Sequence, residues 1–315
     1  MKKINILCAT DDNYVSYCGI MLTSLFENNK DVNIDVYLMT AGLNDKNRLD
    51  FISLSEKYGV NIHIVKVDDD ALKNCPIRLG DHVSLVTYYR LLAPILLPNT
   101  VDRILYLDCD MIVNSSIKVL YNENIDDCAY GAVLDEAFQD IEKYERLEYQ
   151  REKLYCNAGM MLINLEYWRK NQVMERCLDY IEKNPSKVLF HDQDTINVVL
   201  QDEKKLLPLK YNFQTGFILS HYKFDDIIMH EILETVYSPV IIHYTGGISK
   251  PWFAKSKHPY TNIFLYYKNI SLWRKFPLLD RRTFYNKFVD FLLELIWTLG
   301  IKKRPKSYII EMQNK

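Results

Sequence analysis

Glycine and proline are scarce in this 315-residue chain, with only 10 of each, and the formal net charge is only −2 at pH 7. The sequence contains no low-complexity tract and no internal repeat. Proteins that bind nucleic acid usually carry a strongly basic face, so the charge balance argues against a nucleic-acid partner. No stretch reaches the roughly 18 uninterrupted apolar residues that a membrane-spanning helix needs.

Paired cysteines are also lacking. The seven cysteines are scattered, and no two of them form a Cys-x-x-Cys pair, which fits neither a zinc site nor a disulfide framework. The apolar run that starts at Ile4 is interrupted by Asn5 and ended by Asp11 and Asp12, which favours a buried strand over a signal peptide. These features predict a cytoplasmic protein.

Apolar residues make up 48% of the chain and charged residues 25%, so it can bury a sizeable core. Strand and helix patterns alternate in the first half, which indicates an α/β fold with a mostly parallel central sheet flanked by helices. Ligands of such doubly wound folds sit beyond the carboxyl ends of the strands. The expected strands are residues 4–9, 34–40, 62–67 and 103–107, and the expected helices are 14–26, 44–58 (capped by Asn44) and 87–97 (ended by Pro98).

Beyond about residue 125 the pattern is mixed, with strands expected at 130–134, 160–164 and 239–244 and a helix at 192–200. The tail differs from the rest. Residues 284–299 are strongly apolar with helical spacing, and the basic run Lys302, Lys303 and Arg304 follows. Two interpretations stay open: a helix that docks on the core with a solvated basic end, or a peripheral membrane anchor.

Three Asp-x-Asp pairs occur, and one of them has a distinctive context. Only Asp108 and Asp110 close a strand that looks buried and precede a second apolar stretch. In an extended segment, residues i and i+2 point to the same side, so these carboxylates should project together while Cys109 points away. Such convergence is costly unless a cation lies between the carboxylates. We therefore predict a divalent ion that bridges to a diphosphate, with a solvated turn as the alternative. The other two pairs are Asp68/Asp70 and Asp192/Asp194.

Several ordered segments carry a resemblance to a known family. They are residues 8–14 (Cys-Ala-Thr-Asp-Asp-Asn-Tyr), 87–91 (Thr-Tyr-Tyr-Arg-Leu), 106–110 (Tyr-Leu-Asp-Cys-Asp), 157–159 (Asn-Ala-Gly), 192–194 (Asp-Gln-Asp), 243–246 (His-Tyr-Thr-Gly) and 250–252 (Lys-Pro-Trp). Over roughly residues 4–252 the chain resembles glycosyltransferase family 8, which includes bacterial lipooligosaccharide α-galactosyltransferases and glycogenin. The resemblance implies a GT-A nucleotide-sugar-binding fold, with a catalytic domain at residues 1–265 and a helical, basic C-terminal extension at 266–315.

The activity that this resemblance implies is retaining transfer of a hexose, galactose or glucose, from a UDP-sugar. The acceptor would be a saccharide or glycolipid in cell-envelope polysaccharide or lipopolysaccharide synthesis, reached from the cytoplasm or the cytoplasmic face of the inner membrane. Mn²⁺ is the implied cofactor, with Mg²⁺ as the alternative.

By the same resemblance, Ala9, Asp11 and Asn13 hold uridine and ribose, and Arg90 lies at the donor. The residues themselves leave two alternatives: Asp11 or Asn13 could cap the following helix, and Arg90 could be a surface arginine whose stem packs on apolar neighbours.

The phosphate side of the donor is implied to meet four further positions. His243 would be the third metal ligand beside Asp108 and Asp110, since imidazole with carboxylates suits manganese better than calcium. The Asp108-Cys109-Asp110 segment as a whole would contact the donor. Gly246 and Gly247 would approach phosphate, and Lys250 would reach the diphosphate as a compact charge. The loop from His243 to Lys250 has one residue more than the family pattern, so we expect it to bulge.

The sugar side is implied to be lined by Asp135, by Asn157 and Ala158 in an expected tight turn, and by Asp192 and Gln193. The open alternative for Asp192 is a helix N-cap. Gln193 occupies the position of a nucleophile, but a neutral amide is a poor one. A front-face attack, in which the acceptor enters on the side that UDP leaves, therefore accounts better for retention than a double displacement.

Three other functions stay open from the sequence. A sugar nucleotidyltransferase would want a glycine-rich phosphate loop after the first strand, and residues 9–14 contain no glycine. A non-catalytic nucleotide-sugar-binding protein and a UDP-sugar hydrolase are the others.

Overall fold

The computed structural model describes residues 3–77, 84–219, 223–247 and 249–280, together with residues 292, 295, 296 and 298 of the tail. Its centre is a seven-stranded sheet in the order β3-β2-β1-β4-β7-β6-β8. Within it only β7 runs antiparallel to its neighbours, as the sequence predicted for a mostly parallel sheet. The strands are β1 (Ile4–Ala9), β2 (Ile34–Thr40), β3 (Asn61–Lys66), β4 (Arg103–Leu107), β6 (Tyr130–Leu134), β7 (Cys156–Asn164) and β8 (Lys204–Leu206).

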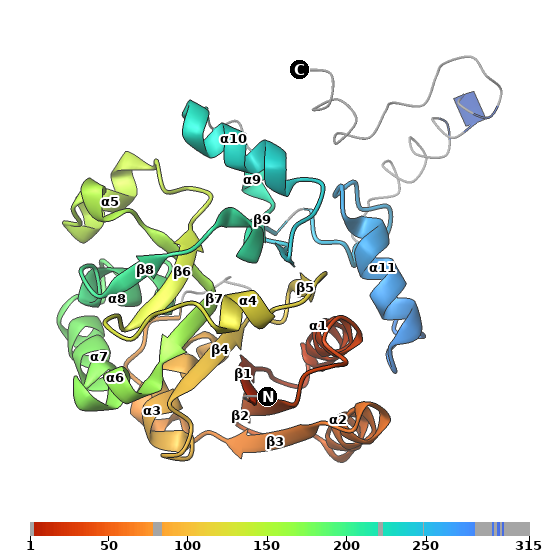
Figure 1. The fold of residues 1–315 in the computed structure, drawn as a ribbon, viewed down its shortest axis with the longest axis horizontal. Coiled ribbons are helices and arrows are strands. Elements are labelled where there is room, and N and C mark those ends of the chain that lie inside the picture. Colours follow the sequence, from red (N-terminus) through yellow and green to blue (C-terminus); the bar gives the residue numbers. More distant parts are fainter. Residues whose placement is uncertain are drawn as a thin grey trace.

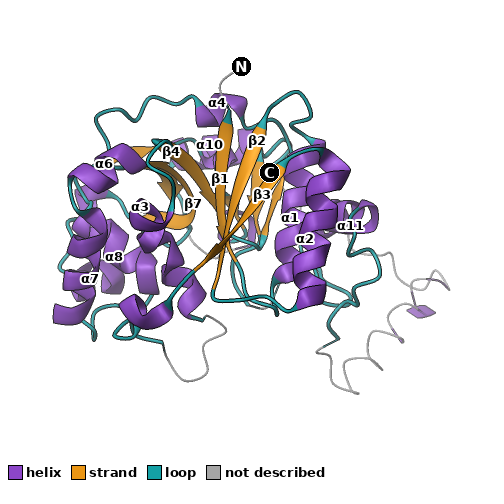
Figure 2. Ribbon diagram, turned by 90° about the horizontal axis from the view of Figure 1, so that it is seen from below, coloured by secondary structure: helices purple, strands orange, loops and turns teal. Residues whose placement is uncertain are grey.

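Helices cover both faces of this sheet (Figures 1 and 2), which explains why all seven residues of β2 are buried. One core lies under α1 (Val15–Glu27) and α2 (Asp45–Tyr58). The other core lies under helices of the opposite face. These are α3 (Ala93–Leu96), α6 (Leu165–Lys170), α7 (Val173–Lys183) and α8 (His191–Val199). Asn44 caps α2 as expected, because its side chain accepts a hydrogen bond from the Asn47 N–H at 2.9 Å.

A second, three-stranded sheet extends beyond the carboxyl edge of the first, and the sequence did not predict it. Its order is β5-β10-β9, from β5 (Met111–Val113), β10 (Ile241–His243) and β9 (Phe213–Gln214). β10 pairs antiparallel with β5, and His243 stands opposite Met111. This register places His243 beside the turn that joins β4 to β5. The remaining helices are α4 (Lys118–Tyr121), α5 (Ile141–Leu147), α9 (Gly216–Leu219), α10 (Asp226–Thr235) and α11 (Thr261–Ile270).

Two sequence predictions of secondary structure were wrong. Residues 87–97 do not form one α-helix but a 3₁₀ helix, Leu85–Leu92, followed by α3. Pro94 lacks an N–H and its ring crowds the carbonyl of Arg90, so a continuous α-helix cannot pass this point. Residues 157–159 are not a tight turn, because they lie inside β7. There the carbonyl of Gly159 accepts a hydrogen bond from the Asp108 N–H at 2.8 Å.

The C-terminal part of the described chain packs on the N-terminal helices. α11 lies against α1, and the Trp273 ring rests on the bare backbone of Gly19, where a Cβ would lie 2.0 Å from the ring. α11 spans residue 265, where a domain boundary was expected, and that division stays a prediction. Most of the apolar tail at residues 284–299 and the basic run after it lie outside the described residues. In the described part of the chain, no helix has the length and apolarity needed to cross a bilayer.

Candidate metal and donor site

Two carboxylates and an imidazole meet at the carboxyl edge of the main sheet. One ligand atom from each of Asp108, Asp110 and His243 lies within 4.8 Å of the others, which makes them the one such cluster among the described residues. Nε2 of His243 is 3.2 Å from Oδ1 of Asp110. Asp108 and Asp110 belong to the turn between β4 and β5 rather than to an extended segment, yet their carboxylates converge as predicted.

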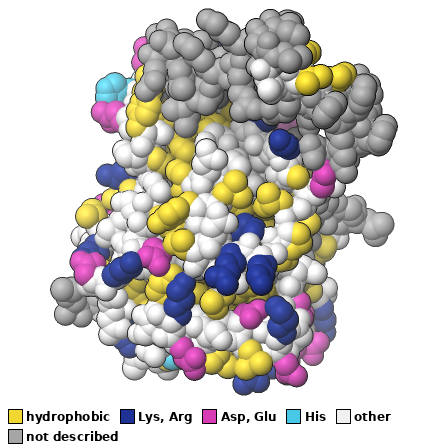
Figure 3. Space-filling view, turned by 90° about the vertical axis from the view of Figure 1, so that its right-hand side faces the viewer, with side chains coloured by type: hydrophobic (Ala, Val, Ile, Leu, Met, Phe, Trp, Pro, Cys, Tyr) yellow, Lys and Arg dark blue, Asp and Glu magenta, His cyan; other side chains and the backbone are white. Residues whose placement is uncertain are grey.

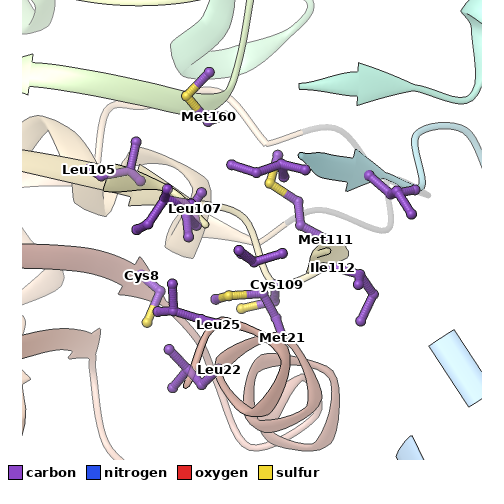
Figure 4. Packing of buried hydrophobic residues seen from close by; sticks show 14 of the residues in the cluster. Cys8, Met21, Leu22, Leu25, Leu105, Leu107, Cys109, Met111, Ile112 and Met160 are labelled. Atoms are coloured by element: carbon purple, nitrogen blue, oxygen red, sulfur yellow. The ribbon is translucent and has the colours of Figure 1, made fainter. Parts of the chain in front are cut away.

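The side chain of Cys109 points away from this cluster into the core below it, where it lies near α1 with Cys8 and Met21 (Figure 4). Its thiol contacts the Ala9 carbonyl at 3.1 Å. The contact joins the end of β1 to the turn that carries both aspartates. Cys109 can therefore face a donor only through its backbone.

Asp108 is oriented by hydrogen bonds from Tyr106 and Arg90. The Tyr106 hydroxyl donates to Oδ1 at 2.7 Å, and a guanidinium nitrogen of Arg90 donates to the same oxygen at 2.9 Å. The guanidinium also lies over the Tyr106 ring at 3.8 Å. A Cβ on Gly159 would lie 2.7 Å from Oδ2 of Asp108 and 2.4 Å from Cε1 of His243. Only glycine at this point of β7 leaves both ligands room.

Arg90 is not a surface residue, because only 3% of it is exposed. Besides Asp108 it binds the carbonyls of Thr87 and Ala158, and its Nε lies 3.0 Å from Oδ2 of Asp192. This arginine joins one metal-ligand candidate to Asp192, which opens α8. Asp192 does not cap that helix, since its Oδ1 accepts from the Thr87 hydroxyl at 2.5 Å. Burial raises the pKa of Asp192, although the charge of Arg90 opposes the shift.

Asp110 is held by Lys250 and His243. Nζ of Lys250 lies 2.5 Å from Oδ2, and Lys250 also contacts the carbonyl of Tyr244. Burial alone would raise the pKa of Asp110, but Lys250 and His243 outweigh it and hold that pKa far below its usual range. Gly246 has φ +75°, a conformation that favours glycine. The expected bulge between His243 and Lys250 includes residue 248, which lies outside the described residues.

The sugar-side candidates form one hydrogen-bonded group around Asp135. Its Oδ1 accepts from Nζ of Lys143 at 2.8 Å and from the Ala137 N–H at 3.1 Å. Its Oδ2 accepts from the side-chain amides of Asn157 and Gln193, each at 3.1 Å. The Gln193 carbonyl in turn accepts from the Ala158 N–H at 2.9 Å. The structure thus brings four of the five predicted sugar-side residues together, while the fifth, Asp192, is bound by Arg90 and Thr87 instead.

At the end of β1, Asp11 accepts hydrogen bonds from the N–H groups of Asn13 and Tyr14 at 2.9 and 3.1 Å. These N–H groups belong to the turn before α1, whose N-cap position is Tyr14, so Asp11 stabilises that turn and its second carboxylate oxygen is left for another partner. Ala9 is buried, Asp11 is half-buried and Asn13 is exposed. Because β1 and β4 are parallel neighbours, this segment and the metal cluster lie at the same edge of the sheet. Uridine binding here stays a prediction.

Sequence reasoning missed four residues that support the site: Tyr106, Lys143, Gly159 and Asn212. Tyr106 and Gly159 belong to segments that it quoted, but neither position was given a role. Lys143 and Asn212 gave no signal, because a lysine in a short helix and an asparagine after a single helical turn are ordinary features.

The fold and the site define a GT-A type of sugar-transferring enzyme, in which an Asp-x-Asp turn meets a histidine at the edge of a mostly parallel sheet. Residues 5–256 match the model of the family described as glycosyl transferase family 8. The chain belongs to that family.

Individual relatives agree with this assignment. The chain is 31% identical to a lipopolysaccharide 1,2-glucosyltransferase of Escherichia coli, over 88% of this chain and 81% of that protein. It is 29% identical to general stress protein A of Bacillus subtilis, over 86% of this chain and 94% of the relative. Among solved structures, the galactosyltransferase LgtC in complex with donor and acceptor sugar analogues superposes with a TM-score of 0.77 at 24% identity. That match covers 86% of this chain and 99% of LgtC, and it supports the fold.

Proposed function

We propose that this family 8 glycosyltransferase transfers galactose or glucose from a UDP-sugar to a saccharide acceptor, with retention of configuration and with Mn²⁺ as the cofactor. The observation that carries the proposal is the cluster of Asp108, Asp110 and His243 beside the ammonium group of Lys250. Two carboxylate oxygens and one imidazole nitrogen are ligands that suit Mn²⁺, with Mg²⁺ as a less favoured alternative. A bound ion would supply positive charge that stabilises the leaving diphosphate.

The chain's own residues would bind the diphosphate and the sugar of the donor. Lys250 is placed to bind a phosphate oxygen, with Gly246 and Gly247 offering close approach of backbone. Asp135, Asn157, Ala158 and Gln193 would hold the sugar. The acceptor hydroxyl would pass its proton to the departing phosphate oxygen, and positioning would supply the rest of the catalysis.

The contacts of the acidic residues support front-face attack. Asp135 already accepts four hydrogen bonds, and Asp192 is bound by Arg90 and Thr87. A carboxylate engaged in this way is a weak nucleophile. Gln193 has no charge to offer. No described acidic residue of the sugar-side group is therefore prepared to form a covalent intermediate.

The names of the relatives suggest the acceptor. One acts in lipopolysaccharide synthesis as a glucosyltransferase, and LgtC is a galactosyltransferase. We propose an acceptor of this kind, a glycolipid precursor at the cytoplasmic face of the membrane. The face that carries α11 has basic, acidic and apolar side chains (Figure 3), and Leu272, Arg274 and Lys275 after α11 are exposed. Together with the basic tail, this face would contact anionic lipid.

The experiment is a screen of UDP-sugars for UDP release with Mn²⁺, with Mg²⁺ and with a chelator, followed by NMR of the product. We expect Mn²⁺-dependent turnover of UDP-galactose or UDP-glucose and an α-linked product. An inverted product would contradict the mechanism. Binding of UDP-sugar without release of UDP would favour the non-catalytic binding protein, and UDP release that no saccharide acceptor accelerates would favour the hydrolase.

The membrane contact has its own test, since truncation after Asp280 removes the tail but keeps the backbone hydrogen bonds of Leu279 with Trp252 and Ala254. We expect the truncated protein to release UDP from the donor as the full chain does and to lose binding to anionic vesicles. If it binds vesicles as well as the full chain does, or becomes insoluble, the tail is structural.

A further inference from the structure

A chain of buried side chains links the sugar side of the site to the metal side. Asp135 is bonded to Asn157, Asn157 to Asn212 at 2.9 Å, and Asn212 to Nδ1 of His243 at 2.9 Å. All four are at least nine-tenths buried, and Asn212 is completely so. The Asn212 side chain bonds Asn157 and His243, and so lies between the sugar side and the metal side.

The two ends of this chain fix the direction of each hydrogen bond. The Asp135 carboxylate can only accept, so Asn157 must present its NH₂ group to it. Burial would raise the pKa of Asp135, but the adjacent Lys143 ammonium outweighs it, and the pKa lies below the usual carboxyl value. The Asn157 oxygen then faces the N–H of Gly159 at 3.0 Å as well as Asn212. It accepts from both.

The same reasoning continues to the imidazole. Because Asn212 donates its NH₂ group to Asn157, its oxygen faces His243 and must receive the proton of Nδ1. Nε2 of a neutral His243 then carries a lone pair. That nitrogen points at Oδ1 of Asp110 over 3.2 Å, so two acceptors face each other and need a cation or a proton between them.

We propose that Asn212 is a positioning residue that holds neutral His243 as the Nδ1–H tautomer and so presents the Nε2 lone pair to the metal. The proposal rests on the metal site of the proposed function. It also gives Asp135 and Asn157 a second role, because they orient the Asn212 amide. Partners behind a ligating histidine commonly change metal affinity by about 10- to 100-fold.

The first measurement uses the metal-free wild-type chain, labelled with ¹⁵N at histidine, at an alkaline pH where imidazole is neutral. His243 is assigned among the seven histidines from a spectrum of His243→Ala. We expect a protonated Nδ1 and an unprotonated Nε2. A dominant Nε2–H tautomer overturns the proposal, whatever the protein's affinity for metal.

The second measurement compares Asn212→Ala with Asn212→Asp, which keeps an acceptor for Nδ1. Mn²⁺ affinity is measured by electron paramagnetic resonance with saturating UDP. We expect Asn212→Ala to mix the tautomers and weaken Mn²⁺ binding by about 10- to 100-fold, and Asn212→Asp to retain the Nδ1–H tautomer and most of the affinity. The control is Asn29→Ala, since Asn29 is a buried amide that bonds the Leu25 carbonyl and the Ile117 N–H, away from the metal cluster.

The outcomes separate the two claims. If Asn212→Ala keeps the wild-type tautomer and affinity and only loses stability, as Asn29→Ala should, Asn212 is structural and the proposal fails. If the wild type shows the Nδ1–H tautomer but binds no Mn²⁺ in the presence of UDP, the proposed metal site is wrong. The proposal that Asn212 positions His243 for a metal then fails with it. If Asn212→Ala does not fold, the wild-type spectrum and Asn212→Asp still decide.

Discussion

The turn between β4 and β5 and the start of α8 carry the same Asp-x-Asp pattern, but the two pairs of carboxylates differ in burial and in their partners. The side chains of Asp108 and Asp110 remain 28% and 19% exposed, and both approach the imidazole of His243. Asp192 and Asp194 are 2% and 0% exposed; Asp194 pairs with Arg146, and Asp192 shares Arg90 with Asp108. The pattern alone does not make a metal site. All four carboxylates have a cationic partner, so what separates the two pairs is that Asp108 and Asp110 remain partly exposed and approach His243.

The largest effect in this comparison should come from Asp194. Its carboxylate accepts from Arg146 at 2.8 Å, from the Tyr155 hydroxyl at 2.7 Å, and from the N–H groups of Leu189 and Phe190. Asp194→Ala would leave these buried donors unpaired, so we expect the free energy of unfolding to fall by about 3–5 kcal/mol.

Denaturant unfolding checks this value. The matched control is Asp70→Ala, in the third Asp-x-Asp pair, where the side chain is exposed and the change should stay within about 0.5 kcal/mol. A loss below about 1 kcal/mol for Asp194→Ala would remove the structural half of the comparison.

Acid should affect the metal side next, because burial lowers the pKa of a histidine there, His258. His258 is 3% exposed, its Nδ1 accepts from the Tyr260 N–H, and its Nε2 faces the Thr215 hydroxyl. Burial, aided by Lys250, lowers the pKa of His258 to about 4. Above the unfolded value of about 6.5 the histidine is neutral in both states and does not affect stability.

As the pH falls from about 6.5 to about 4, the unfolded chain takes up this proton and the native chain does not, so native stability declines by up to about 3 kcal/mol. Thermal unfolding should show a shallower pH dependence over this window for His258→Gln than for the wild type. Equal slopes would mean that His258 is not buried as a neutral imidazole.

A smaller effect is expected from Gly159, because the absence of a side chain there leaves space for His243 and Asp108. An alanine Cβ would collide with His243 and Asp108, so Gly159→Ala should weaken Mn²⁺ binding by about 10-fold or more. Gly42→Ala is the control, because a Cβ there has no neighbour within 4 Å. If titration of Mn²⁺ in the presence of UDP gives both variants the same affinity, the side chains of Asp108 and His243 are not packed against residue 159 as the structure indicates.

The sequence predicted six of the seven strands of the main sheet because they are largely apolar runs, and it missed β8, which is short and begins with two lysines. The polar residues after β1 and β4 predicted a shared ligand edge. It could not predict the sheet β5-β10-β9, whose strands have two or three residues and pair across long stretches of chain. The Asn-x-Gly segment of β7 was mistaken for a turn, although Gly159 is required by the side chains it faces. The burial of Arg90 was missed because its partners, Asp108 and Asp192, are distant in sequence.

The central claim is that Asp108, Asp110 and His243 bind the metal that holds the donor diphosphate. Isothermal titration of UDP, with Mn²⁺ and with a chelator, into the wild type and Asp110→Asn tests it most directly. We expect Mn²⁺-dependent binding of UDP by the wild type and at least about 100-fold weaker binding by the variant, which should still fold. Equal UDP affinity in the two proteins, or full wild-type affinity after verified removal of metal, would contradict the account.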